Sequence, residues 1–250
     1  MNDITTRQND LERFYEQMNR LKTILRKYHY LQDCNGRMEW PKRGVYYFFE
    51  EEDYRHDSTQ LRVVRVGTHA VSKGAKSTLW SRLRTHRGHM SQAGNHRGSV
   101  FRLLVGSALI SRGDYPASAV SMWGTGSSAG HDVRMNEKMV EIDVSRYIGS
   151  IPFLWVAVDD EPGPQSLRKY IEKNSIALLS NSVGCPDCPS KTWLGFDCQN
   201  IKICESGLWN SDHIFDSYNP AFLDILEKYV SLMASSENAP LDKYLEAPTH

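Results

Sequence analysis

The sequence has no long apolar run. Its longest stretches of this kind, LLVGSALI and IPFLWVAV, have eight residues each, whereas a transmembrane helix needs about 20 apolar residues in succession. The N-terminal residues are polar and lack the apolar centre of a signal peptide. These absences predict a soluble protein of the cytoplasm with no membrane partner.

Cysteine is scarce, with five residues in a chain of 250, and the odd number argues against a disulfide framework. We therefore expect a reducing compartment. Four of the five lie in one late segment, where the pair Cys185 and Cys188 has the spacing of half a zinc site. Five residues separate Cys198 from Cys204, more than the two to four that usually separate such a pair. We do not expect structural zinc at these four residues.

Acidic residues are absent between Leu61 and Gly113, although the chain as a whole has 30 basic and 30 acidic residues and a net charge of zero. We call this stretch the basic block. Such a block is typical of a surface that contacts polyphosphate. The alternative is a solvated basic face that balances the acidic C-terminal part. The residues that we expect to contact DNA are Lys73, Lys76, Arg84, Arg87, His96 and Arg97.

Hydrophobic periodicity predicts alternating helices and strands. In the predicted helices, apolar residues recur at spacings of three and four residues. Short runs of β-branched and aromatic residues mark the predicted strands. Asn219 and Pro220 form the start signal of the last helix. The predicted helices are Leu11–Tyr28, Leu79–Arg87, Phe101–Ile110, Leu167–Leu179 and one after Pro220, and the predicted strands are Gly44–Phe49, Leu61–Val66 and 151–160.

These elements predict an α/β (α+β) fold with a small central antiparallel sheet of about three strands flanked by helices. Residues 1–40 form an N-terminal helical extension, 41–184 the core and 185–250 a C-terminal extension with a docking helix. An insertion at about 94–149 interrupts the core. Its glycine-rich loop WGTGSSAGHD lacks the G-K-[ST] ending of a phosphate-binding loop, so we assign it no nucleotide role.

The order of motifs resembles the GIY-YIG nuclease family. Gly44, Val45 and Tyr46 match the first half of the signature, and Val66 with Gly67 matches the second. The resemblance continues through a helix with an arginine and then a histidine four residues on, a third strand, and a helix with a glutamate. Each triplet is common by chance, but the ordered set is far more specific. It covers roughly residues 43–181, and its last three positions are Arg82, His86 and Glu172.

The resemblance implies hydrolysis of DNA, expected to be double-stranded, with one divalent metal, Mg²⁺ or Mn²⁺. By the same resemblance, Tyr46 positions or deprotonates the water, and Arg82 holds the phosphate oxygens. His86 assists proton movement and Glu172 holds the metal. Phosphodiester hydrolysis needs these functions: an activated water, neutralised phosphoryl oxygens and help for the leaving oxygen.

This chain departs from the family pattern at one position. Arg65 stands where the second signature carries tyrosine, so His69 or Tyr47 could replace that tyrosine. The family's asparagine after the glutamate is matched best by Asn181.

Each candidate also has a structural interpretation. Arg82 could form a salt bridge, Glu172 could pair with Arg168 one helical turn away, and Tyr46 and His86 could be ordinary core residues. If the motif is vestigial, the protein binds nucleic acid without cutting it. The segment HRGHMSQAGNHRG could be taken for a compact His-Asn-His metal site, but the hairpin and helix that flank such a site are not recognisable here. We therefore interpret the segment as a phosphate-contacting loop.

Overall fold

A four-stranded antiparallel sheet with the strand order β1-β4-β2-β3 lies at the centre of the fold. The computed structural model describes residues 4–56, 58–89, 94–182, 184–185 and 187–235. The predicted fold class is confirmed, and β1 adds a two-residue edge strand to the three expected ones. The strands are β1 (His29–Tyr30), β2 (Gly44–Tyr54), β3 (Leu61–Gly67) and β4 (Pro152–Ala157).

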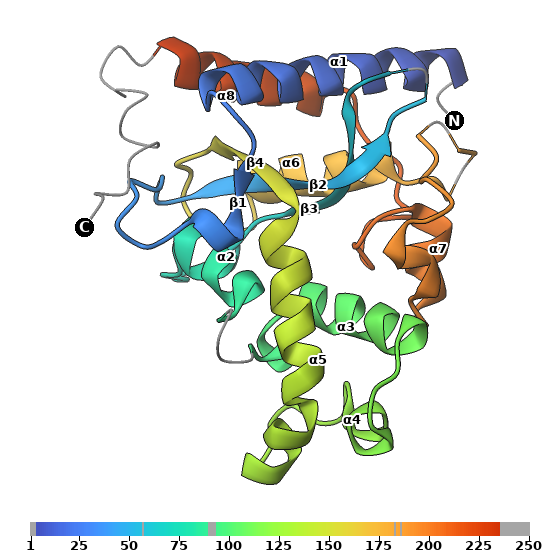
Figure 1. Ribbon diagram of the computed structural model, residues 1–250. Coiled ribbons are helices and arrows are strands. Elements are labelled where there is room, and N and C mark those ends of the chain that lie inside the picture. The colour runs from blue at the N-terminus through green and yellow to red at the C-terminus, as the bar shows by residue number, and fades with distance from the viewer. Residues whose placement is uncertain (1–3, 57, 90–93, 183, 186, 236–250) are drawn as a thin grey trace.

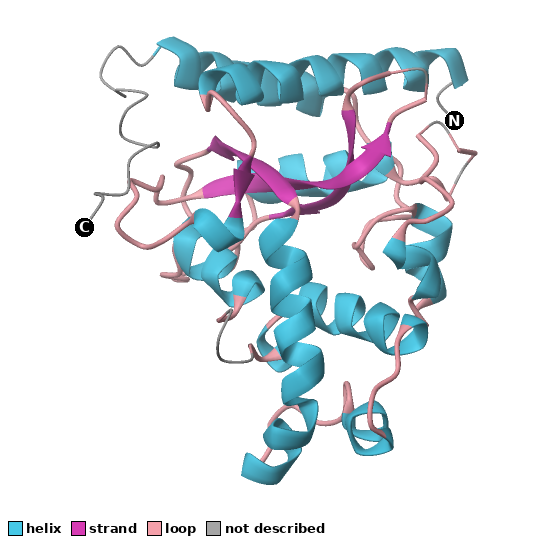
Figure 2. Cartoon of the chain, in the orientation of Figure 1, coloured by secondary structure: helices cyan, strands magenta, loops and turns pink. Residues whose placement is uncertain are grey.

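Helices cover both faces of this sheet (Figure 2). Helices α1 (Ile4–Ile24), α6 (Leu167–Leu179) and α8 (Ala221–Ser235) pack against one another on one side. On the other side lie α2 (Leu79–Arg87), α3 (Val100–Arg112) and α5 (His131–Ser150) (Figure 1). The bounds of α2 and α6 are those that the sequence predicts. The remaining elements are α4 (Ala117–Met122), α7 (Ile201–Ser206), and the 3-10 turns η1 (Leu31–Asp33), η2 (His96–Gly98) and η3 (Leu194–Asp197).

Alternation along β2 divides its aromatic side chains between the two faces, because successive strand residues point to opposite sides. The Tyr47 ring lies 5.6 Å from Phe14 of α1, measured between ring centroids. The Phe48 ring lies 5.3 Å from Phe101 of α3. Tyr46 shares the face of Phe48, and β2 therefore presents Tyr46 to α2 and α3.

The insertion contains more helix than the sequence predicts. It forms an arm of α3, α4 and α5 that extends away from the sheet (Figure 1). Helix α5, with 20 residues, was not predicted. Its buried residues with large apolar side chains are Val140, Val144 and Ile148, and charged residues stand between them in the sequence. That stripe is too narrow to stand out as an amphipathic pattern.

A buried ion pair fixes the arm to the end of α2. Arg102 of α3 donates from Nε to Glu141 Oε2 of α5 at 3.0 Å. It also donates to Ser145 Oγ at 3.0 Å and to the His86 carbonyl oxygen at 2.9 Å. A buried arginine with all these partners holds three helices in one arrangement, and α2 and the arm therefore form a single unit.

No helix in the described parts of the chain is both long and apolar enough to span a lipid bilayer.

Candidate active site

A chain of hydrogen bonds links β2, α2 and α3. Tyr46 Oη lies 2.7 Å from His86 Nε2, and His86 Nδ1 lies 2.7 Å from Ser99 Oγ. Both rings are buried. Burial, then the charges of Arg82 and Arg65, lower the pKa of His86 well below its ordinary value. The imidazole is therefore neutral at pH 7, with one nitrogen able to accept a proton.

The two glycines of the signature are explained by close packing. Gly67 of β3 pairs directly with Tyr46 of β2, and a Cβ atom at Gly67 would collide with the phenol ring and its hydroxyl group. A Cβ atom at Gly44 would lie 2.5 Å from the Val156 carbonyl oxygen. Glycine at 67 therefore lets the Tyr46 ring cross β3 toward His86, and glycine at 44 lets β2 approach β4.

Glu172 of α6 reaches the end of β3. Its Oε1 accepts a hydrogen bond from the Thr68 backbone N–H at 2.9 Å. Burial raises the pKa of Glu172, and the hydrogen bond from Thr68 and the charge of Arg65 oppose this increase. Arg168 pairs with Asp160 instead, so the predicted alternative of a helical pair between Glu172 and Arg168 is wrong.

Arg82 has no ion pair within the described residues. Its Nη1 donates only to the Gly98 carbonyl oxygen, at 3.3 Å. The predicted salt bridge is therefore not formed there. The charge of Arg82 nevertheless acts on His86, Glu172 and Arg65, since it contributes to the pKa shift of each. Arg82 is thus a half-buried cation directed to the same place as the carboxylate and the imidazole.

Arg65 lies on the Tyr46 face of the sheet, because it pairs across the strands with Phe48. Its side chain is buried, donates to the Trp209 carbonyl oxygen and lies 4.7 Å from the Phe101 ring centroid. Burial lowers its pKa, and Tyr46 opposes that change. The residue that replaces the second signature tyrosine therefore places a guanidinium group beside Tyr46.

The two proposed substitutes for that tyrosine lie elsewhere. Tyr47 is fully buried on the opposite face, where burial raises its pKa well above 10. His69 is buried, and its Nε2 lies 3.3 Å from the Lys42 carbonyl oxygen. Burial, and then the charge of Arg168, lower the pKa of His69 to about 4. Neither group shares the hydrogen bonds of Tyr46, and the replacement of the missing tyrosine by either stays a prediction.

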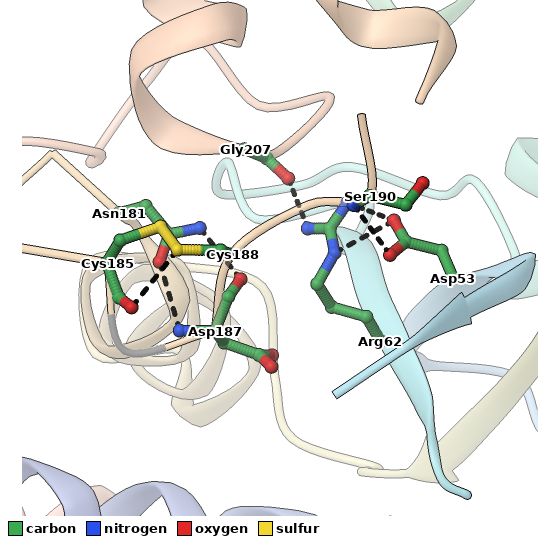
Figure 3. The surroundings of a disulfide bond; sticks show 8 residues. All are labelled: Asp53, Arg62, Asn181, Cys185, Asp187, Cys188, Ser190 and Gly207. Atoms are coloured by element: carbon green, nitrogen blue, oxygen red, sulfur yellow. Dashed lines mark hydrogen bonds and ion pairs between the residues drawn. A yellow bond between two sulfur atoms is a disulfide. The ribbon is translucent and has the colours of Figure 1, made fainter. Parts of the chain in front are cut away.

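Asn181 belongs to a structural loop. Its Nδ2 donates to the Asp187 carbonyl oxygen at 2.9 Å, and its own backbone N–H donates to the Ser206 carbonyl oxygen at 2.8 Å. Figure 3 shows it beside the Cys185–Cys188 disulfide, directed toward Asp187. The amide is thus occupied within the loop, and Asn181 does not join the cluster around Tyr46.

Half of the eight arginines of the basic block form ion pairs with carboxylates of other elements in the described structure. Arg62 pairs with Asp53 at 2.8 Å (Figure 3) and Arg112 pairs with Asp197 at 2.5 Å. Arg87 donates to the Cys34 carbonyl oxygen at 2.6 Å and is half-buried, so it does not point outward as predicted. The exposed members of the predicted DNA-binding set are Lys73, Lys76 and Arg84.

His96 and Arg97 are also engaged within the protein. His96 is buried, with Nδ1 3.0 Å from Glu141 Oε1 and its ring 4.0 Å from that of Trp123. Arg97 forms two hydrogen bonds of 2.7 Å with Glu137. Internal carboxylates thus occupy these two side chains of the predicted phosphate-contacting segment, and residues 90–93 of that segment lie outside the described residues.

Sequence reasoning missed three residues of the site. Ser99 caps α3 by accepting from the Arg102 N–H and also contacts His86. Asn210 exchanges two hydrogen bonds with the Val66 backbone, at 3.0 and 2.9 Å, and so covers the edge of β3. His213 contributes to the pKa shift of Glu172. Only Ser99, as a helix N-cap, has a local sequence signal.

The site offers few protein side chains as metal ligands, so it suits a cation that needs only one or two of them. In the described part of the chain, no three His, Cys, Asp or Glu residues gather in a metal-binding group. No hydrogen bond from a described residue engages Glu172 Oε2, so this oxygen can take a ligand. Magnesium is commonly held by one or two carboxylates, water and substrate phosphate. Glu172 therefore fits the predicted Mg²⁺ or Mn²⁺.

The comparison with protein families agrees with the arrangement of the signature residues. The family model described as GIY-YIG domain matches residues 5–236, which is nearly the whole chain. No curated protein and no solved structure matches the sequence. The signature residues Gly44, Tyr46 and Gly67 lie together on paired strands, and the fold is of the nuclease type. The chain belongs to the GIY-YIG domain family.

Proposed function

We propose that this protein is a metal-dependent endonuclease that hydrolyses phosphodiester bonds of double-stranded DNA. The observation that carries the proposal is the 2.7 Å contact between Tyr46 Oη and a neutral His86, beside which Arg82, Arg65 and Glu172 converge. A tyrosine that only fills the core needs no imidazole, guanidinium and carboxylate groups around it. A tyrosine that activates water next to a phosphate needs all three kinds of group.

Tyr46 and His86 would form the proton relay. The Tyr46 oxygen would accept a proton from the attacking water while the phenol proton passes to His86. In the neutral ring, Nε2 of His86 is free to accept that proton. Ser99 holds the ring through Nδ1. The neighbouring arginines destabilise the imidazolium ion, so His86 holds the proton only briefly. General acid–base steps of this kind contribute roughly 10²- to 10⁴-fold to a rate.

Arg82 would neutralise the charge that develops on the phosphoryl oxygens. It is half-buried and has no carboxylate partner among the described residues, so its charge is available to a substrate. Arg65 is fixed by Trp209 and would supply a second, stationary positive charge at the same place. Glu172 would hold Mg²⁺ or Mn²⁺, and the bound ion would supply Lewis-acid stabilisation of the reacting phosphate.

A second candidate function rests on Arg65 itself. An arginine in the place of the signature tyrosine removes one hydroxyl group from the site, which would leave a protein that binds nucleic acid without cutting it. The two functions differ in one measurement, the release of cut DNA.

The test is cleavage of plasmid and linear duplex DNA by the purified full chain. We expect cleavage with Mg²⁺ or Mn²⁺ and none in excess EDTA. Cleavage that persists in EDTA would contradict the metal-dependent mechanism. Tight, salt-sensitive binding without cleavage in either metal would leave the binding function in its place.

A further inference from the structure

A groove of about 770 Å³ lies between α2 and the arm. The outer side of α2 forms one wall, the first half of α5 forms the other, and the turn around Gly98 forms part of the lining. The residues used below are Arg84 on α2 and Arg134 and Lys138 on α5. The groove is open to solvent and belongs largely to the insertion, for which the sequence suggests no role.

The carboxylates that line the groove are already neutralised. Glu137 accepts two hydrogen bonds of 2.7 Å from Arg97. Glu141 is held by the buried Arg102 and by His96. Neither carboxylate can cancel the charge of a further cation without breaking a buried pair, which commonly costs about 3–5 kcal/mol.

Three exposed cations therefore determine the charge of the groove. Arg84, Arg134 and Lys138 form no ion pair with any residue that the structure describes. Arg134 and Lys138 are four residues apart on α5 and so project from the same side of the helix. Arg84 faces them from the opposite wall. The groove is thus positive on both walls and has no free negative charge among its described residues.

One lining residue of the groove contacts the candidate active site. Gly98, which lines it, accepts the hydrogen bond from Arg82, and Ser99 beside it contacts His86. Arg82 and Arg84 lie on the same short helix. Arg82 and Arg84 point to different sides of α2, so a polyanion with one phosphate at Arg82 would reach the groove by passing the turn at Gly98.

We propose that this groove binds the phosphate backbone of the DNA duplex that flanks the scissile phosphate, with Arg134 and Lys138 as contacts supplied by the insertion. The inference rests on the proposed function. A backbone is favoured over a small anion because the cations are exposed and spread over two helices instead of converging on one point. Contacts of this kind increase affinity without sequence preference and weaken with salt.

The test compares two double variants of the full chain. Arg134→Gln with Lys138→Gln removes two charges from the groove. The matched control, Lys27→Gln with Lys228→Gln, removes two exposed charges on the side of α1 and α8. Binding to a fluorescein-labelled 30-base-pair duplex is measured by anisotropy from 0.05 to 0.2 M salt without metal, and cleavage is measured separately with Mg²⁺. Circular dichroism melts accompany each variant.

The groove variant should bind about sixtyfold more weakly at 0.1 M salt, the amount given by two phosphate contacts. The slope of log K against log salt should become shallower by about 1.8, since each phosphate contact on duplex DNA contributes about 0.9. Cleavage at saturating DNA should change less than about twofold. The control should bind as the parent does. Arg134→Lys with Lys138→Arg, which keeps both charges, should restore binding.

Two outcomes separate the failure of this inference from that of the proposed function. If the parent protein binds and cuts DNA while the groove variant binds like the control, the groove contact is wrong and the endonuclease remains. If the parent neither binds nor cuts duplex DNA, both proposals fail together. A folded charge-keeping variant that stays weak would also overturn a contact based on charge.

Discussion

The two sides of α2 face different kinds of surroundings. At the catalytic edge, which we define as Tyr46, His86 and Glu172, each side chain is buried or half-buried and makes at least one hydrogen bond. In the groove, Arg84, Arg134 and Lys138 are exposed. The catalytic edge therefore depends on position, because a shift of about 1 Å can cost a hundredfold in rate. The groove depends on charge, which tolerates movement and is screened by salt.

The largest expected effect is at Glu172. Glu172→Ala should abolish cleavage, since it removes the only carboxylate that we assign to the metal. DNA affinity measured by anisotropy should stay close to that of the parent, because a carboxylate adds no attraction for phosphate. A circular dichroism melt is the control, as Thr68 loses its hydrogen-bond acceptor. A folded variant that cuts at the parental rate would remove Glu172 from the mechanism.

Arg82 should come next. Arg82→Ala should slow single-turnover cleavage on the order of a thousandfold, the scale found for arginines that neutralise a reacting phosphoryl group. Arg82→Lys keeps the charge and should recover only part of the rate, because an ammonium group cannot reproduce the guanidinium fork. If both variants bind weakly yet cut normally at saturation, Arg82 belongs with the groove and the distinction between the two regions disappears.

Tyr46 tests the relay alone. Tyr46→Phe keeps the ring that crosses Gly67 and removes only the hydroxyl group that contacts His86. Cleavage should fall by about 10²- to 10⁴-fold, whereas the free energy of unfolding should fall by only about 1 kcal/mol, the net value of one hydrogen bond. If the free energy of unfolding falls while the cleavage rate stays at the parental value, Tyr46 serves only the packing of the core.

Acid should destabilise the buried surroundings of His69, whereas the groove cations do not titrate below pH 7. The pKa of His69 is lowered to about 4 in the folded protein, so the unfolded chain binds the proton first. Stability is therefore lost as pH falls from about 6.5 toward 4, by up to about 1.4 kcal/mol per pH unit. Urea unfolding at pH 7, 6 and 5 should show a smaller decline in His69→Asn. Equal declines would contradict the buried, neutral His69.

The smallest effect is expected at Arg84. Arg84→Ala should weaken duplex binding about eightfold at 0.1 M salt, the amount given by one phosphate contact. Single-turnover cleavage at saturating DNA should match the parent. A rate loss comparable to that of Arg82→Ala would place Arg84 in the active site and not in the groove.

The sequence predicted the local elements of this protein well. Capping and periodicity gave α2 and α6 with their observed bounds, because the signals for a helix lie within the helix itself. The order of motifs also selected Tyr46, Arg82, His86 and Glu172. In the structure Tyr46 and His86 share a hydrogen bond, and the charge of Arg82 contributes to the pKa shifts of His86 and Glu172. Helix α5 was missed because its apolar stripe is narrow and much of its packing is polar, through Glu137 and Glu141.

Charge neutralisation was decided by the tertiary structure alone. The basic block lacks acids along the chain, yet Asp53, Glu137 and Glu141 reach Arg62, Arg97 and Arg102 from other elements. Ion pairs and buried hydrogen bonds join groups that are distant in sequence, so composition can count the cations but cannot say which remain free. The sequence by itself thus determined α2, α6, the three main strands and the signature, while only the packing of distant elements against one another decided which arginines face solvent.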